Sequence, residues 1–130
     1  MRRNFNLEKL SALANRFDIE GDVIEISPFG SGHINDTYRV LTNGPGPGAY
    51  LLQRINHHVF KNVDAVMQNM QRVIRHLKEK YIAANVSASD IEKKVLTLIP
   101  TMEGTTYRVD EDGNFWRMLV LLTGTRSYDI

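Results

Sequence analysis

The chain contains no cysteine, almost no net charge and no long run of apolar residues. The absence of cysteine excludes disulfides, thiol catalysis and cysteine-ligated zinc. The 16 basic and 15 acidic residues leave a formal charge of +1, which gives no general argument for binding nucleic acid or an anionic membrane. No apolar segment follows the basic N-terminus, so we expect neither secretion nor membrane insertion, and a cytoplasmic protein.

What the chain does contain is the composition of an ordinary globular domain. Of its 130 residues, 42% are hydrophobic and 24% are charged, which is sufficient for one core. The spacing of apolar, β-branched and turn-forming residues predicts the secondary structure. The expected elements are a helix within 1–20, strands at 23–29, 37–42 and 49–55, a helix over 63–80, a short helix after Ser87, and strands at 95–99, 105–109 and 115–122.

The order of these elements predicts an α+β fold. We expect a twisted antiparallel sheet of five or six strands, with one long amphipathic helix packed on it and an additional N-terminal helix. Asn62 is the expected N-cap of the long helix, and Met67 and Met70 belong to its apolar stripe, which we assign to core packing. In the last expected strand, the stretch from Met118 to Leu122 is apolar on both faces, so it should be covered on both sides or lie at an interface.

The most informative stretch is the loop GSGHINDTY, which begins at Gly30 and separates two expected strands. Gly30 and Gly32 lack a Cβ, so the backbone there can adopt positive φ and approach an anion closely. A glycine-rich turn between antiparallel strands is one way to present backbone N–H groups to phosphates. The same residues are also compatible with a hairpin turn that binds nothing.

Three further segments follow this loop in order: LLQRIN, VFKNVDAVM and WRMLVLLTGTRSYD. With GSGHINDTY, they resemble the N-terminal lobe of the aminoglycoside phosphotransferase and choline kinase superfamily, a protein-kinase-like fold. The four segments are most similar to the N-acetylhexosamine kinase branch, whose members phosphorylate the anomeric hydroxyl of an N-acetylhexosamine with ATP. The resemblance runs from about residue 20 to the end of the chain. It implies a nucleotide-binding lobe at 21–130, after the expected N-terminal helix at 1–20, and a catalytic lobe that is absent from this chain.

The resemblance also implies which loop residues meet the nucleotide. The loop would cover the ATP phosphates, with His33 and Asn35 directed toward phosphate or the acceptor sugar. The candidate binding residues in the loop are Gly30, Ser31, Gly32, His33 and Asn35.

The exit of the last strand is the second part of the implied nucleotide site. Its backbone N–H and C=O groups would bind the adenine edge, which requires no particular side chain. The residues that match this hinge are Leu121, Leu122 and Thr123. Apolar side chains would enclose the adenine ring. The candidates are Ile26 and either Val40 or Leu52.

The third strand departs from the kinase pattern. Kinases place a lysine there and pair it with a glutamate of the following helix. Here Gln53 and Arg54 occur together, and alternation sends their side chains to opposite faces, so only one can face the nucleotide. Gln53 matches the usual basic position, whereas Arg54 has the charge that suits phosphate, and the choice between them stays open. The helix has no glutamate before Glu79, so the ion pair is absent or replaced by a neutral hydrogen bond.

No histidine pair has a metal-ligand spacing, and we expect no metal ligand in this chain. Magnesium would arrive with ATP and be held by carboxylates of the missing lobe, which would also supply the catalytic aspartate. Alone, the chain should therefore be inactive. The exposed inter-lobe surface makes self-association an expectation. The competing interpretation is a non-catalytic α+β module that binds protein through a sheet edge or helix face.

Overall fold

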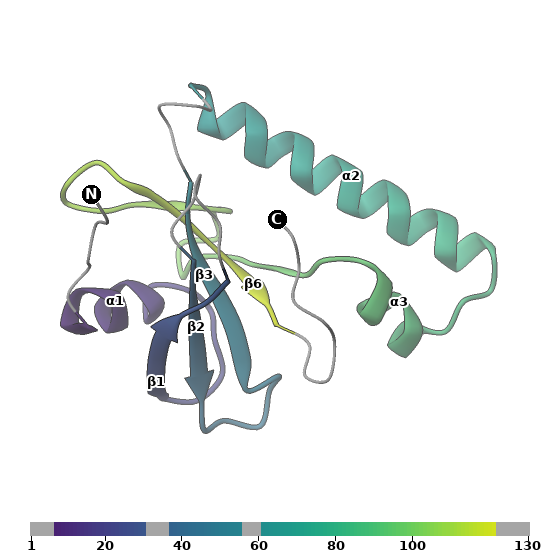
Figure 1. Cartoon of the computed structure of the whole chain (residues 1–130). Helices are drawn as coiled ribbons and strands as arrows, with labels where there is room; N and C mark the ends of the chain where they lie inside the picture. The colour runs from purple at the N-terminus through teal and green to yellow at the C-terminus, as the bar shows by residue number, and fades with distance from the viewer. Residues whose placement is uncertain (1–6, 31–36, 56–60, 122–130) are drawn as a thin grey trace.

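The computed structural model describes residues 7–30, 37–55 and 61–121 (Figure 1). In these ranges the elements are, in order, α1 (Leu7–Ala14), β1 (Val23–Pro28), β2 (Thr37–Thr42), β3 (Ala49–Ile55), α2 (Val63–Ala83), α3 (Ala88–Lys94), β4 (Leu98–Ile99), β5 (Arg108–Val109) and β6 (Phe115–Val120). Among the described helices, none combines the length and the apolar character that crossing a bilayer requires.

The described strands form one antiparallel sheet with β3 and β6 at its centre. The strand order is β1–β2–β3–β6–β4, and β5 also pairs with β6. The expected α+β fold with an antiparallel sheet is thus confirmed. Residues 116–119 of β6 are all buried, so the strand is covered on both faces there, whereas Val120 and Leu121 are half-buried.

The strand register separates the side chains into two faces. Because residues directly opposite one another in a ladder share a face, the pairs Leu52–Met118 and Gln53–Arg117 point to opposite sides of the sheet. The first face packs against α1. Its core contains Leu10, Leu13, Ala14, Phe17, Tyr38, Val40, Tyr50, Leu52, Trp116 and Met118. The second face packs against the start of α2 through Ile55, Val63 and Met67.

Helix α2 contacts the sheet mainly through its first turns. Asn62 caps it by accepting a hydrogen bond from the backbone N–H of Ala65 at 3.0 Å, as expected. Met67 is fully buried, whereas Val73 is 49% exposed and Leu77 is 37% exposed. Figure 1 shows the reason, since the C-terminal half of α2 extends past the strands toward α3. The outer part of the apolar stripe therefore remains on the surface.

Two strands are much shorter than the sequence predicted. Ser87 caps α3 by accepting the N–H of Asp90 at 3.3 Å, and the helix continues far enough that Val95 becomes its C-cap. The expected strand at 95–99 is thereby reduced to β4. The expected strand at 105–109 is reduced to β5, because Thr105 closes a turn with Thr101. In that turn the backbone N–H of Thr101 donates to the carbonyl of Thr105 at 2.8 Å.

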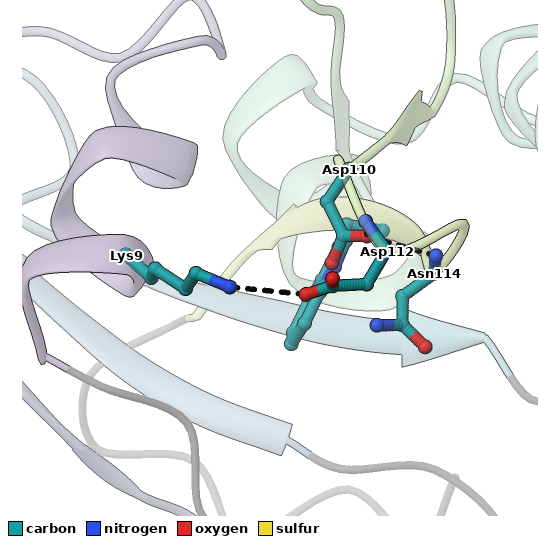
Figure 2. A network of polar contacts seen from close by, with 5 residues as sticks. Lys9, Asp110, Asp112 and Asn114 are labelled. Atoms are coloured by element: carbon teal, nitrogen blue, oxygen red, sulfur yellow. Dashed lines mark hydrogen bonds and ion pairs between the residues drawn. The ribbon is translucent and has the colours of Figure 1, made fainter.

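The turn between β5 and β6 is organised by the carboxylate of Asp110 (Figure 2). Its Oδ1 accepts the backbone N–H groups of Asp112 at 2.8 Å and Asn114 at 2.9 Å, and its Oδ2 accepts the indole N–H of Trp116 at 2.8 Å. Burial by itself raises the pKa of Asp110, but these hydrogen bonds outweigh it and lower the pKa below its ordinary value. Lys9 of α1 pairs with Asp112 at 3.0 Å, so α1 also contacts this turn.

Candidate functional site

The glycine loop is closed at its base by the hairpin of β1 and β2. The N–H of Phe29 donates to the carbonyl of Thr37 at 2.9 Å, so the two ends of the loop lie side by side. Gly30 has φ +77°, and apart from its chain neighbours no described residue has an atom within 4 Å of the place where a Cβ would lie. The expected positive φ is therefore confirmed at Gly30. The other loop candidates lie outside the described residues: Ser31, Gly32, His33 and Asn35.

Gln53 and Arg54 lie on opposite faces of β3, as alternation predicted. Gln53 is 2% exposed and stands between Thr37 of β2 and Arg117 of β6, on the face that α2 covers. Arg54 is half-buried and lies opposite Trp116, on the α1 face. Of these two residues, only Gln53 shares a face with Thr37, which lies where the glycine loop enters β2.

Arg117 is the functional candidate that sequence reasoning missed. Its side chain is nearly buried, with 8% of the residue exposed, and its Nε–H donates to Oε1 of Gln53 at 2.7 Å. Its Nη1 lies 3.4 Å from Sδ of Met70 and 3.9 Å from Sδ of Met67, both on α2. Burial lowers the pKa of the Arg117 guanidinium. A charged residue inside an apolar strand was the one sequence signal that could have identified it.

Three polar side chains form a row across the centre of the sheet. Nε2 of Gln53 lies 3.4 Å from Oγ1 of Thr37, and Oε1 of the same amide accepts from Arg117. The row therefore runs from the end of the glycine loop, through β3, to the guanidinium on β6. Helix α2 closes the row with the thioethers of Met67 and Met70.

The proposed hinge is described only at its first residue. The N–H of Leu121 donates to the carbonyl of Ala49 at 3.0 Å, which extends the β3–β6 ladder by one bond beyond β6. That N–H is engaged by the sheet, so Leu121 can offer adenine its carbonyl only. Leu122 and Thr123 lie outside the described residues.

The three apolar side chains expected around adenine lie on the face of the sheet that α1 covers. Ile26, Val40 and Leu52 lie on the α1 face, opposite to Gln53, and all three belong to or pack against the α1 core. Val40 and Leu52 are 0% exposed there. A nucleotide beside Gln53 would lie on the other face of the sheet from these side chains, which share their face with Arg54, so their contact with adenine stays a prediction. Strand alternation could be predicted from the sequence, but the face that α1 covers could not.

In the described ranges, no group of three His, Asp or Glu side chains is arranged to hold a metal ion, so we assign no magnesium ligand to them. For a phosphate group, the row ending at Arg117 supplies a suitable donor set: a guanidinium and an amide beside a loop with an open glycine.

Comparison with protein families gives a match that covers this whole region. The model of a phosphotransferase enzyme family matches residues 25–125. The matched span begins in β1 and continues past β6, and it includes the glycine loop, Gln53, Arg117 and the first hinge residue.

Proposed function

The chain belongs to the phosphotransferase enzyme family, and on that premise we propose that it is the ATP-binding lobe of an enzyme that phosphorylates a small sugar. The observation that carries this proposal is the position of the glycine loop. Its ends are joined by the hydrogen bond between Phe29 and Thr37, and the polar row of Thr37, Gln53 and Arg117 begins at its exit. Enzymes of this family generally act on phosphates of ATP, which would lie where loop and row meet.

In this proposal the loop contributes both backbone and side-chain groups. Backbone N–H groups from Gly30 to Gly32 cover the phosphates, and the missing Cβ of Gly30 leaves room for them. His33 and Asn35 point to phosphate or to the acceptor sugar. Adenine lies at the strand exit, where the carbonyl of Leu121 and the backbone of the next residues, Leu122 and Thr123, hold its edge.

We propose an N-acetylhexosamine as the acceptor, phosphorylated at a hydroxyl. The support is the similarity of the four segments GSGHINDTY, LLQRIN, VFKNVDAVM and WRMLVLLTGTRSYD to the N-acetylhexosamine kinase branch. We also propose that residues 21–130 act with a second lobe, which supplies the catalytic aspartate and the carboxylates for Mg²⁺. Phosphoryl transfer depends on those groups for positioning and charge neutralisation, so the lobe alone should not catalyse it.

Titration with ATP tests the nucleotide site directly. We expect amide shifts that saturate with ATP at residues 30–37 and 121–124. His33→Ala should weaken ATP binding by roughly threefold to tenfold, the effect of losing one hydrogen bond. His76→Ala, on the exposed side of α2, is the matched control and should change nothing. Absence of saturation at millimolar ATP would contradict the proposal.

An activity assay tests the division between two lobes. The 130-residue chain, incubated with ATP, Mg²⁺ and N-acetylglucosamine, should form no sugar phosphate, while a longer product of the same gene that includes a second lobe should form it. Phosphorylation by the 130-residue chain would show that the catalytic groups lie within it. Activity of the longer product on another sugar, with none on N-acetylhexosamines, would contradict the proposed acceptor alone.

One observation favours the second candidate function, a protein-interaction module. The outer half of α2 exposes Val73, Leu77 and, at 64%, Ile82, which is the kind of helix face that a partner or a second copy could cover. Sedimentation over a range of concentrations, with Leu77→Asp as the comparison, tests self-association. A monomer at every concentration, together with saturable ATP binding, would leave the nucleotide-binding proposal as the sole explanation.

A further inference from the structure

We propose that Arg117 on β6 is the cation that binds the nucleotide phosphates, and that Gln53 on β3 positions it. The inference rests on the proposed function, since it concerns the ATP site of the same lobe. Neither Gln53 nor Arg54 is then the phosphate-binding cation. The charge comes from Arg117 on the neighbouring strand β6, and Gln53 on β3 provides the amide that orients the guanidinium.

The register places the guanidinium beside the position where kinases have their lysine. Gln53 and Arg117 are direct Cα partners in the β3–β6 pair, so their side chains leave the same face side by side. The Nε–H of Arg117 reaches Oε1 of Gln53 at 2.7 Å, which shows that the guanidinium lies next to the end of the glutamine side chain. The charge is thus displaced by one strand but remains on the face that carries Thr37 and the loop exit.

Among the residues that the structure describes, none compensates the charge of Arg117. A guanidinium has five N–H donors, and the contacts of Arg117 with described residues are one amide oxygen and two thioether sulfurs, which are weak acceptors. None of these partners is a carboxylate. A buried charge without a counter-charge is costly, and burial accordingly lowers the pKa of this group. An entering phosphate would provide the missing counter-charge and match the planar fork of the guanidinium.

The same geometry explains a neutral residue at position 53. A lysine there would place a second cation against the guanidinium, whereas the glutamine accepts from Arg117 and donates toward Thr37 with one side chain. Arg54 cannot substitute, because its side chain lies on the α1 face, opposite Trp116.

The test compares three probes, ATP, tripolyphosphate and adenosine, in calorimetric titrations of the chain. Arg117→Met keeps the length of the side chain and removes its charge. This substitution should weaken the binding of ATP and of tripolyphosphate roughly 10- to 100-fold, as expected for the loss of charge-assisted hydrogen bonds. The affinity for adenosine should not change. Arg108→Met is the matched control, because Arg108 pairs with Glu103 at 2.6 Å on the edge of the sheet and should not affect any probe. Loss of ATP binding in Arg54→Met but not in Arg117→Met would overturn the proposal.

Two variants of position 53 separate positioning from structural support. Gln53→Glu keeps the acceptor and gives Arg117 a buried counter-charge, so it should weaken ATP binding while the melting temperature stays the same or rises. The double variant Gln53→Lys with Arg117→Gln returns the cation to the third strand and should recover part of the ATP affinity that Arg117→Gln alone loses. A purely structural role predicts the opposite, namely a lower melting temperature and equal losses for ATP and adenosine.

The outcomes distinguish this inference from the proposed function. If the wild-type chain binds ATP and Arg117→Met binds it equally well, the inference fails and the nucleotide site stands. If the wild type binds tripolyphosphate through Arg117 but neither ATP nor adenosine, the anion site stands and the ATP-binding function fails. If the wild type binds none of the three probes, both proposals are wrong.

Discussion

Replacing Asp110 by asparagine tests how the turn before β6 is held. The carboxylate accepts three hydrogen bonds: two from the backbone N–H groups of Asp112 and Asn114, and one from the indole N–H of Trp116. Asparagine can retain the two backbone bonds through its single oxygen. Its NH₂ group then faces the indole N–H, so two donors meet and the indole donor of a residue that is 0% exposed loses its acceptor.

The magnitude follows from this hydrogen-bond inventory. An unsatisfied buried donor costs about 1–3 kcal/mol. In addition, the two backbone N–H groups would donate to a neutral oxygen in place of a charged one. Asp110→Asn should therefore reduce the free energy of unfolding by about 2 kcal/mol. For a domain of this size, that loss corresponds to about 8 °C in melting temperature. Because the turn fixes the start of β6, the strand that carries Arg117, the variant should also broaden the amide signals of β6.

Urea unfolding followed by circular dichroism measures the effect, with Asp112→Asn as the matched control. Asp112 has its carboxylate in an exposed ion pair with Lys9, so removing its charge should leave the unfolding midpoint unchanged. In a Trp116→Phe background the indole donor is gone, and Asp110→Asn should cost about 1 kcal/mol less. An equal loss in both backgrounds would refute the proposed role of the indole hydrogen bond.

The pH dependence of the free energy of unfolding gives an independent check of the role of Asp110. The pKa of Asp110 is lowered in the folded chain from an ordinary value of 3.8, so the ionised carboxylate stabilises the fold above that value. The stabilisation is lost as the pH falls below 3.8 through the folded pKa. The difference in unfolding free energy between wild type and Asp110→Asn should therefore be constant at neutral pH and shrink in this acidic range. A difference that grows on acidification would contradict the assignment.

Three further substitutions test the packing that supports the site. Gly44→Ala should destabilise the fold by about 1–3 kcal/mol, because the new Cβ would lie 2.6 Å from backbone atoms of Glu20 and Gly21. Thermal unfolding measures this loss. Met67→Ala should cost about 2–4 kcal/mol, whereas the surface substitution Leu77→Ala should cost less than about 1 kcal/mol. Asn62→Ala removes the cap of α2 and should cost about 1 kcal/mol in urea unfolding, while Asn62→Asp should retain the cap.

Local patterns in the sequence were sufficient for most of the fold. The caps at Asn62 and Ser87, the hairpin strands and the two-sided burial of β6 depend on neighbouring residues, and each was predicted correctly. The extent of β4 and β5 was wrong, because it depends on how far α3 continues and on a turn between Thr101 and Thr105. Exposure of the outer half of α2 was also missed, because an apolar stripe does not specify how much sheet lies beneath it.

At the candidate site, the residue types that border the glycine loop and the divergence of Gln53 and Arg54 could be predicted without the structure. The sequence also determined the positive φ that Gly30 adopts, because glycine tolerates that conformation at little cost. Only the tertiary structure decided that Arg117 lies against Gln53 and that Val40 faces α1. Those contacts depend on the pairing of strands distant in sequence and on the face that each helix covers, and a local pattern of residues contains neither.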